Sequence, residues 1–340
     1  MESLGVAIIG CGAIHNVHVD AIKNNGMGRI LWFVDTQEER AKASAQKHGG
    51  QWHTDYHRVF EDPNVDVVHI CTPHYLHAQM AIDAVNAGKH AFVEKPVATN
   101  LEMAKMMAEA AKKNNRMITI CFQNRYNPTS VRAKEILNSG ELGKIIGIKG
   151  LVTWYRDSDY YTSSDWRGRF DTEGGGVLIN QSIHTLDLIQ WLVEDVVEYI
   201  QGNVSTRVLK DVIEVEDTAD ATLYFKNGAR GIFYATNCYT DNSPVEIEIH
   251  LEKGKLRICD DKLIKIQDGK FEVLVDETCE TSPYKSYWGM SHDTLIREFY
   301  ENLIRGNNRD IIPVEEGMIS LQILDGIYKS SSTGNKIKIN

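Results

Sequence analysis

The sequence lacks the marks of several protein classes. None of its six cysteines forms a CxxC pair or has zinc-finger spacing, so the sequence predicts packed, inert thiols in a reducing compartment. No apolar run approaches the length of a membrane-spanning helix. The first residues, MESLGVAIIG, have neither a basic region nor a small-residue cleavage site. We therefore expect a cytoplasmic protein without a membrane partner.

The chain also lacks a surplus of positive charge. It has 37 lysines and arginines against 47 aspartates and glutamates, which gives a formal net charge of −10. An acidic chain binds a phosphate backbone or an anionic membrane poorly, so we expect no nucleic-acid partner. Prolines are few, at 7 among 340 residues. A chain of 340 residues is longer than a single hydrophobic core usually accommodates. Two domains are therefore expected.

Short apolar runs alternate with helical patterns in the first third of the chain. The runs are Gly5–Ile9, Ile30–Val34, Val65–Cys71, His90–Val93 and Met117–Phe122. The helical patterns cover residues 14–25, 37–48, 76–87 and 99–114. The last pattern opens on a capping-box signature at Thr99 and Glu102. Short strands separated by helices predict a parallel sheet with right-handed crossovers, an α/β domain over residues 1–123.

The pattern changes after residue 123. Several segments alternate between apolar and polar residues, as half-buried strands do. The turn signals between them are Asn227-Gly228, Lys253-Gly254 and Asp268-Gly269, the first a strong two-residue hairpin signal. Helical patterns at residues 183–191 and 291–304 interrupt the strands. We expect residues 124–340 to form an α+β domain with a large, mostly antiparallel open sheet.

When helices pack on one face of such a sheet, the opposite face has no covering layer. A second copy of the chain would cover it, so we expect a homodimer or homotetramer formed through the C-terminal sheet. A solvated polar face fits the pattern nearly as well.

A glycine motif, Gly10-Cys11-Gly12-Ala13-Ile14-His15, joins the first apolar run to the first helical pattern. Gly10 permits a tight turn, and Gly12 permits a pyrophosphate to approach the backbone at the helix N-terminus. Asp35 follows the second run. A carboxylate there accepts from both ribose hydroxyls of adenosine and repels a 2′-phosphate, so NAD is favoured over NADP. A helix cap is the alternative role for Asp35.

Two further motifs contain groups suited to proton transfer. Lys95, in Glu94-Lys95-Pro96 after the fourth run, can donate to a substrate hydroxyl oxygen, and Glu94 can hold that lysine or a ribose hydroxyl. A glycine-rich stretch leads to Asn180, His184 and Asp187, which have the spacing of one helix face. A histidine there can take a hydroxyl proton as hydride leaves the same carbon, whereas a buried core histidine is the structural alternative.

Aromatic residues and an arginine cluster just before the glycine-rich stretch. They are Tyr155, Arg156, Tyr160, Tyr161 and Trp166, a set that suits a pyranose or cyclitol ring as well as it suits a partly buried loop. His292, at the start of the late helical pattern, is a further candidate for a substrate hydroxyl. The histidines at 15, 18, 74 and 77 do not form a convincing metal set, and hydride transfer needs no metal.

Taken in order, these motifs resemble the glucose–fructose oxidoreductase/inositol dehydrogenase (Gfo/Idh/MocA) family. The resemblance covers nearly the whole chain and includes the segments GCGAIHNVHVDAI, CTPHYLHAQMAIDAVNAGKHAFVEKP, CFQNRYNP, DWRG and GGGVLINQSIHTLDLIQWL. The EKP tripeptide combined with the glycine-rich helix entry is its most specific part. The resemblance implies an N-terminal Rossmann domain that binds the dinucleotide and a C-terminal domain for substrate and oligomerisation.

The resemblance also implies residue roles. Gly10, Gly12, Ala13 and Ile14 would line the pyrophosphate, Asp35 the adenosine ribose, and Thr72, Pro73 and His74 the adenine side. Glu94, Lys95 and Gln123 would lie near the nicotinamide, and Trp166 and Arg167 would touch cofactor or substrate. Lys95, Tyr155, Asn180, His184 and His292 would contact substrate, with Lys95 and His184 as the catalytic pair.

One departure from the family affects the mechanism. Inositol-dehydrogenase-like members have an aspartate where this chain has Asn180, so either His184 or Lys95 could be the principal base, and we favour His184. The implied activity is NAD-dependent hydride transfer at a hydroxyl-bearing carbon of a sugar, nucleotide-sugar or cyclitol. An NAD-retaining lyase or glycosidase that oxidises a sugar transiently is the alternative. A non-enzymatic NAD sensor is disfavoured because both the lysine and the histidine are present.

Overall fold

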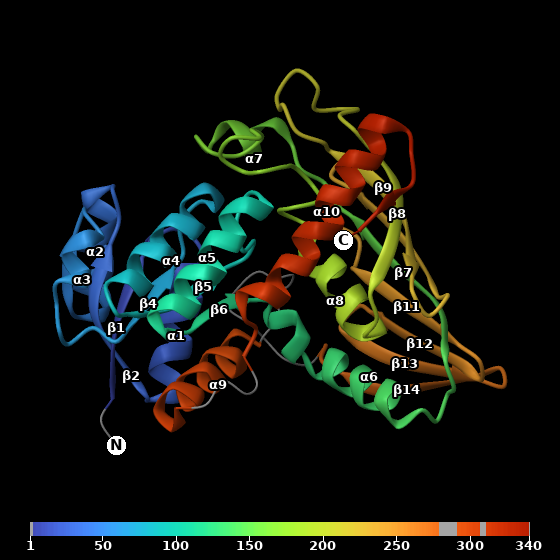
Figure 1. Cartoon of the computed structure of the whole chain (residues 1–340), viewed down its shortest axis with the longest axis horizontal. Helices are drawn as coiled ribbons and strands as arrows, with labels where there is room; N and C mark the ends of the chain where they lie inside the picture. Colours follow the sequence, from blue (N-terminus) through green and yellow to red (C-terminus); the bar gives the residue numbers. More distant parts are fainter. Residues whose placement is uncertain (1–2, 279–290, 307–310, 340) are drawn as a thin grey trace. The chain divides into compact units, whose positions relative to one another are not determined.

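The computed structural model describes residues 3–278, 291–306 and 311–339. The chain divides into two compact units, one of residues 1–123 with 284–318 and the other of residues 124–283 with 319–340. Figure 1 colours both units by position in the sequence. Within the described residues, no helix is both long and apolar enough to cross a membrane.

The first unit is built on a six-stranded sheet in which all neighbouring strands are parallel. Its strands in spatial order are β3 (Gln51–His53), β2 (Gly28–Val34), β1 (Leu4–Ile9), β4 (Val67–Ile70), β5 (His90–Glu94) and β6 (Ile118–Cys121). The strand order reverses between β1 and β4, and ligands bind beyond the carboxyl ends of the strands at such a point. The predicted α/β Rossmann class is confirmed.

Helices follow the strands of the first unit. They are α1 (His15–Asn25), α2 (Glu38–His48), α3 (His57–Phe60), α4 (His77–Asn86), α5 (Leu101–Asn114) and α9 (His292–Arg305), with a 3-10 turn, η1 (His74–Leu76). A second 3-10 turn, η2 (Gln123–Tyr126), falls at the boundary between the units. The N-cap of α5 is Asn100, whose side chain accepts from the Met103 N–H at 3.0 Å, so the capping box predicted at Thr99 is wrong. Asn100 has the extended backbone that an N-cap requires.

The chain returns to the first unit after building most of the second. Phe299 and Tyr300 of α9 are fully buried, and the Phe299 ring packs on Phe92 of β5 at a centroid distance of 5.5 Å. The Ile120 N–H of β6 also donates to the Ile312 carbonyl at 2.9 Å. Residues 284–318 therefore belong with residues 1–123, which differs from the single boundary predicted at residue 123. The apolar face of α9 decides this, because it is buried on the parallel sheet.

The second unit contains a nine-stranded sheet in which β7 and β10 are the one parallel pair among the described strands. In spatial order the strands are β14 (Lys270–Asp276), β13 (Lys262–Gln267), β12 (Gly254–Cys259), β11 (Glu246–Leu251), β7 (Ile145–Thr153), β10 (Arg230–Thr236), β9 (Thr218–Phe225), β8 (Val197–Ser205) and β15 (Ile337–Lys338). The predicted mostly antiparallel open sheet is confirmed.

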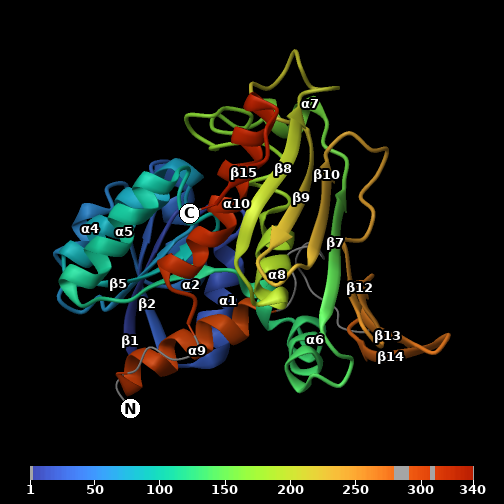
Figure 2. The same cartoon turned by 45° about the vertical axis from the view of Figure 1, so that its right-hand side comes forward.

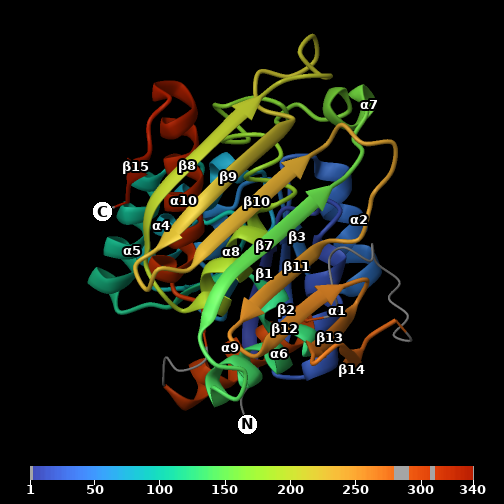
Figure 3. The ribbon, with the colours of Figure 1, turned by 90° about the vertical axis from the view of Figure 1, so that its right-hand side faces the viewer.

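One face of this sheet packs against helices. The helices of the second unit are α6 (Pro128–Ser139), α7 (Ser158–Thr162), α8 (Ile183–Val193) and most of α10 (Val314–Thr333). Helix α8 approaches β7 so closely that a Cβ on Gly150 would lie 2.7 Å from Ile189 Cδ1. Figure 3 shows the strands in front with α8 behind them, and no helix of the described part of this unit over the near face. Figure 2 shows the same unit from an intermediate angle.

Two hairpins follow their turn signals differently. Asp268 and Gly269 have φ of 51° and 73°, as a two-residue type I′ turn requires. At Asn227-Gly228, only Gly228 has a positive φ, and the Phe225 N–H donates to the Ala229 carbonyl at 3.1 Å. Three residues, 226–228, therefore lie inside the hydrogen-bonded pair of Phe225 and Ala229, and the two-residue turn predicted there is wrong.

Candidate active site

The glycine motif forms the turn between β1 and α1. Gly10 has a φ of 94°, and a Cβ there would lie 2.6 Å from the Cys71 carbonyl oxygen. A Cβ on Gly12 would meet no atom of the described residues within 4 Å. The turn itself therefore requires Gly10, whereas Gly12 faces space that none of the described residues fills. The helix that begins at His15 directs its N-terminal dipole to this turn, which suits a pyrophosphate.

Asp35 lies directly after β2 and is fixed by the glycine turn. One carboxylate oxygen accepts from the Cys11 N–H at 2.9 Å, and the other accepts from the Gln37 N–H at 2.8 Å. The N-cap of α2 is Gln37, so Asp35 caps a local turn rather than the helix. The carboxylate is thus oriented where a ribose of a dinucleotide would lie in this fold.

A buried histidine connects the loops that follow β4 and β5. His77, at the start of α4, places Nε2 2.9 Å from the Thr72 carbonyl oxygen and Nδ1 2.8 Å from the Pro96 carbonyl oxygen. These loops contain Thr72, Pro73 and His74 after β4 and Lys95 after β5, which are predicted cofactor and substrate contacts. His77 therefore positions both loops, a role that the sequence motifs did not reveal.

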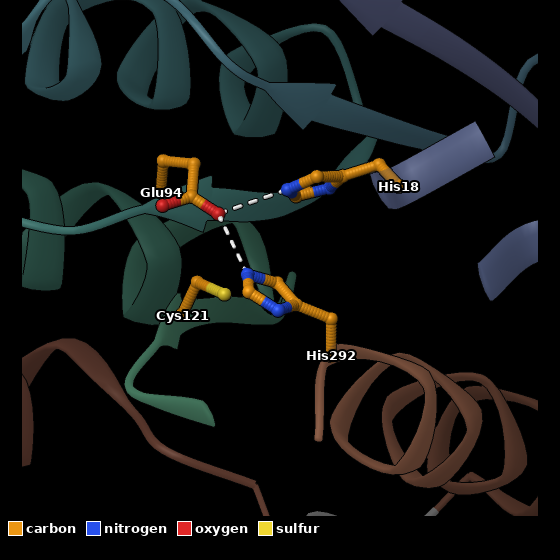
Figure 4. A group of neighbouring side chains, drawn as sticks. All are labelled: His18, Glu94, Cys121 and His292. Atoms are coloured by element: carbon orange, nitrogen blue, oxygen red, sulfur yellow. Dashed lines mark hydrogen bonds and ion pairs between the residues drawn. The ribbon is translucent and has the colours of Figure 1, made fainter. Parts of the chain in front are cut away.

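Glu94, the last residue of β5, points its carboxylate into the protein interior. Its Oε1 lies 2.9 Å from Nε2 of His18 on α1 and 3.7 Å from Nε2 of His292 on α9 (Figure 4). Burial acts to raise the pKa of the Glu94 carboxyl, but hydrogen bonds from His18 and His292 hold it well below its ordinary value. The carboxylate is therefore charged and buried.

Buried polar groups extend from Glu94 away from the sheet edge. His18 Nδ1 lies 2.9 Å from Nδ1 of His69, and His69 Nε2 lies 2.8 Å from the Tyr300 hydroxyl. Burial lowers the pKa of both histidines, that of His69 strongly. Cys121, at the end of β6, completes a group of four with His18, Glu94 and His292, whose ligand atoms lie within 4.8 Å of one another. These four residues could hold a metal ion.

The second unit surrounds Asn180 with polar side chains. Asn180 Nδ2 donates to Glu173 Oε1 at 2.5 Å, and the Gly168 N–H donates to the other carboxylate oxygen. Burial raises the pKa of Glu173 to about 7, against the lowering effect of these two donors. Asn180 lies in a turn before α8 rather than on the helix, so the single helix face expected for Asn180, His184 and Asp187 is wrong.

Two predicted polar groups of α8 have different surroundings. Asp187 is buried and accepts from Arg125 at 2.8 and 2.7 Å. This bidentate ion pair gives Asp187 a structural role. His184 is the second residue of α8 and is half-buried. Of the two, His184 is therefore the candidate for proton transfer.

The aromatic cluster surrounds an arginine. The Arg167 guanidinium lies 4.4 Å from the Tyr160 ring centroid and 5.1 Å from that of Trp166. Tyr160 also accepts a hydrogen bond from Gln181 Nε2 at 3.1 Å. Tyr155 is 48% exposed, and its N–H donates to Asn242. These residues present flat rings and a cation at one end of the second unit.

The structure divides the predicted site residues between the units. Those from Gly10 to Gln123, together with His292, belong to the first unit. Tyr155, Trp166, Arg167, Asn180 and His184 belong to the second. The meeting of Lys95 with His184 stays a prediction. The motifs missed Glu173 and Cys121, and they placed His18 only in a histidine set that did not suggest a metal site. Only the folded chain brings these three side chains to their partners.

The strand order of the first unit, its glycine turn and the oriented Asp35 define a dinucleotide-binding protein of the Rossmann class. Comparison with known proteins assigns the family. Residues 4–122 match the family model described as "Oxidoreductase family, NAD-binding Rossmann fold", and residues 130–257 match the GFO/IDH/MocA C-terminal domain. The chain belongs to the Gfo/Idh/MocA oxidoreductase family, and its cofactor is NAD.

Several relatives are named as dehydrogenases. The chain is 27% identical over 291 residues to levoglucosan dehydrogenase of Pseudarthrobacter phenanthrenivorans, which covers 75% of this chain and 73% of that protein. It is 26% identical to scyllo-inositol 2-dehydrogenase (NAD(+)) of Bacillus subtilis, over 98% and 95% of the two chains. Among solved structures, the WlbA dehydrogenase from Bordetella pertussis in complex with NADH and UDP-GlcNAcA has a TM-score of 0.86 at 28% identity, covering 100% and 99%.

Proposed function

We propose that this protein oxidises a hydroxyl-bearing carbon of a sugar, nucleotide-sugar or cyclitol and transfers the hydride to NAD. The observation that carries the proposal is the hydrogen bond from the Cys11 N–H of the glycine turn to Asp35. This turn lies where the strand order reverses, and the loop that contains Lys95 follows β5 of the same sheet. The relatives named for levoglucosan and scyllo-inositol, and the WlbA structure with a nucleotide-sugar, support these substrate classes.

For the cofactor, we assign the pyrophosphate to the turn and the adenosine ribose to Asp35. Gly10, Gly12, Ala13 and Ile14 would line the pyrophosphate. The Asp35 carboxylate would accept from ribose hydroxyls and repel a 2′-phosphate, which favours NAD over NADP. Thr72, Pro73 and His74 would lie on the adenine side, and Lys95, Gln123, Trp166 and Arg167 nearer the nicotinamide. The Glu94 carboxylate, predicted to lie near the nicotinamide, faces His18 and His292 in the interior instead.

For the reaction, bound NAD supplies the acceptor for the hydride. Lys95 would donate a hydrogen bond to the reacting hydroxyl oxygen and favour its deprotonation electrostatically. His184 would take the hydroxyl proton as the C–H bond breaks, because a neutral imidazole is a suitable base near pH 7. Asn180 and Tyr155 would orient the ring of the substrate.

The experiment is an NADH absorbance assay with a panel of sugars, nucleotide-sugars and inositols, run with NAD and with NADP. We expect NADH formation with at least one member, a preference for NAD, and loss of at least about 100-fold in kcat in Lys95→Ala and in His184→Ala. Exposed Lys112→Ala is the matched control and should retain wild-type turnover.

Other outcomes would change the proposal. Product formed without added cofactor and without NADH accumulation would support a lyase or glycosidase that oxidises the sugar transiently. NAD binding with no turnover across the panel would support a sensor. Full activity in the Lys95→Ala/His184→Ala double variant would overturn the assigned proton-transfer roles.

We also propose that the chain forms a homodimer or homotetramer through the open face of the nine-stranded sheet. Ile232 of β10 is 50% exposed on this face, while its neighbours Gly231 and Phe233 point to the buried side. The cytoplasm stays the predicted compartment, and the five described cysteines form no disulfide.

A further inference from the structure

We propose that His18, Glu94, Cys121 and His292 form a closed zinc site that holds α9 against the parallel sheet of the first unit. The four residues come from α1, β5, the end of β6 and the first position of α9. They are separated by as many as 274 positions in the sequence, as the numbers 18 and 292 show. Their ligand atoms nevertheless lie within 4.8 Å of one another (Figure 4).

The distances require small adjustments in both directions around an ion. Donors of a tetrahedral zinc, with bonds of about 2.0–2.3 Å, lie roughly 3.3–3.8 Å apart. His292 Nε2 and Glu94 Oε1 are already 3.7 Å apart, while His18 Nε2 and Glu94 Oε1 are 2.9 Å apart at hydrogen-bond distance. No donor pair of the four exceeds 4.8 Å, so displacements of about 1 Å would bring the donors to the spacing that zinc requires.

The donor types select the ion. Two imidazole nitrogens, one sulfur and one carboxylate oxygen suit Zn²⁺, whereas Mg²⁺ and Ca²⁺ prefer oxygen alone. Zn²⁺ replaces the thiol proton of Cys121, which leaves as H⁺ to solvent, and Glu94 binds as the carboxylate. One thiolate and one carboxylate then balance the two positive charges, so the buried site is neutral.

A second layer of contacts fits the same interpretation. A zinc-bound histidine usually donates its other ring N–H to a neighbouring acceptor. With zinc on Nε2, His18 carries its proton on Nδ1 and donates to His69 Nδ1, which is 2.9 Å away. His69 then carries its proton on Nε2 and donates to the Tyr300 hydroxyl at 2.8 Å. His18 therefore has the outer acceptor that a zinc-bound histidine usually has, whereas His292 Nδ1 has no hydrogen-bond partner among the described residues.

Burial makes the site structural rather than catalytic. His18, Glu94, Cys121 and His292 are exposed by 0, 7, 0 and 3%, so four protein ligands would close the coordination sphere. His292 was predicted to contact substrate, and its burial beside Glu94 favours the ligand role instead. Because His292 opens α9, the ion would fix the returning segment to β5 and β6.

The test measures metal in untagged, full-length protein purified without chelator. We expect about one zinc per chain by mass spectrometry, and a fall in Tm of about 5 °C or more after chelation that added Zn²⁺ reverses. Co²⁺ exchanged into the protein should show an absorption band of cobalt–thiolate charge transfer. None of these readouts depends on substrate or turnover, so they can fail while the proposed dehydrogenase activity stands.

Variants assign the ligands. Cys121→Ser should abolish the cobalt–thiolate band, and His292→Gln should lower zinc content at least tenfold, while Cys71→Ser and His90→Gln serve as matched controls in the same unit that retain zinc. Wild-type protein with less than about half a zinc per chain after incubation with Zn²⁺, and no zinc-dependent shift in Tm, would overturn the site. The four side chains would then be a buried carboxylate with hydrogen-bond donors only.

Discussion

Glu173 connects solution pH to the orientation of Asn180. Its two carboxylate oxygens accept from Asn180 Nδ2 and the Gly168 N–H, and both bonds need an oxygen without a proton. Burial raises the pKa of Glu173 to about 7, so a proton occupies one oxygen at lower pH. The amide of Asn180 is then less firmly held.

We therefore predict that KM for the substrate rises as pH falls through about 7. In Glu173→Gln the KM should be higher at pH 8 and nearly constant between pH 6 and 8, because the titrating group is gone. The exposed Glu141→Gln is the control and should keep the wild-type profile. An unchanged profile in Glu173→Gln would assign the titration to another group.

The same carboxyl affects stability with a defined sign. Its pKa is higher in the folded protein than the ordinary value of 4.5, so the folded state binds this proton more tightly than the unfolded state does. The stabilisation is complete below about pH 4.5 and is lost as pH rises through about 7. Glu173→Gln should remove this part of the pH dependence of the free energy of unfolding.

At the scale of elements, the turn between β1 and α1 separates a folding requirement from a binding requirement. Gly10 has a positive φ and would place a Cβ 2.6 Å from the Cys71 carbonyl oxygen, whereas a Cβ on Gly12 meets nothing within 4 Å among the described residues. Gly10→Ala should cost about 1–3 kcal/mol of stability. Gly12→Ala should leave Tm within about 1–2 °C of wild type.

Gly12→Ala should affect NAD binding much more than it affects stability. Gly12→Ala places a methyl group where we assign the pyrophosphate, so Kd for NAD should rise at least about tenfold, or about 1.4 kcal/mol. Thermal unfolding and calorimetric titration of both variants measure the two effects. Unaltered NAD affinity in a stable Gly12→Ala protein would remove the pyrophosphate from this position.

Sequence patterns predicted these elements well where local rules dominate. The apolar run Gly5–Ile9 became β1 (Leu4–Ile9), and the helical pattern at residues 37–48 became α2 (Glu38–His48). They failed where neighbouring residues compete for one role: Asn100 caps α5 in place of Thr99. The short edge strand β3 has too few residues for a period to be recognised.

The same limit applies to the candidate site. Glycines and Asp35 are predictable because their function depends on position beside a strand and a helix. Glu173 has no such signal: its role arises from contacts with Asn180 and Gly168, and its raised pKa arises from burial. The sequence shows that Asn180 replaces the aspartate of inositol-dehydrogenase-like members. It does not show that the Glu173 carboxylate accepts a hydrogen bond from Asn180.

At the scale of the whole molecule, the open sheet face leads to a prediction about mass. The chain has a mass of 38.4 kDa, and light scattering should give two or four times this value. Ile232→Glu places a charge at the centre of the face, where its strand neighbours are Lys149 and Thr222, and should shift the population toward monomer. Val208→Glu, at a 66% exposed position outside the strands, is the control. A wild-type monomer would show that the face is solvated.

The late return of α9 to the first unit has a consequence for synthesis on the ribosome. Phe299 and Tyr300 complete a core that residues 1–123 began, and Ile312 supplies a backbone partner for β6. Elongation proceeds from the N-terminus, so the interior of this unit can close only after α9 and Ile312 have emerged, long after β1. A nascent chain arrested near residue 200 should accordingly leave the half-made Rossmann core sensitive to protease and a target for chaperones.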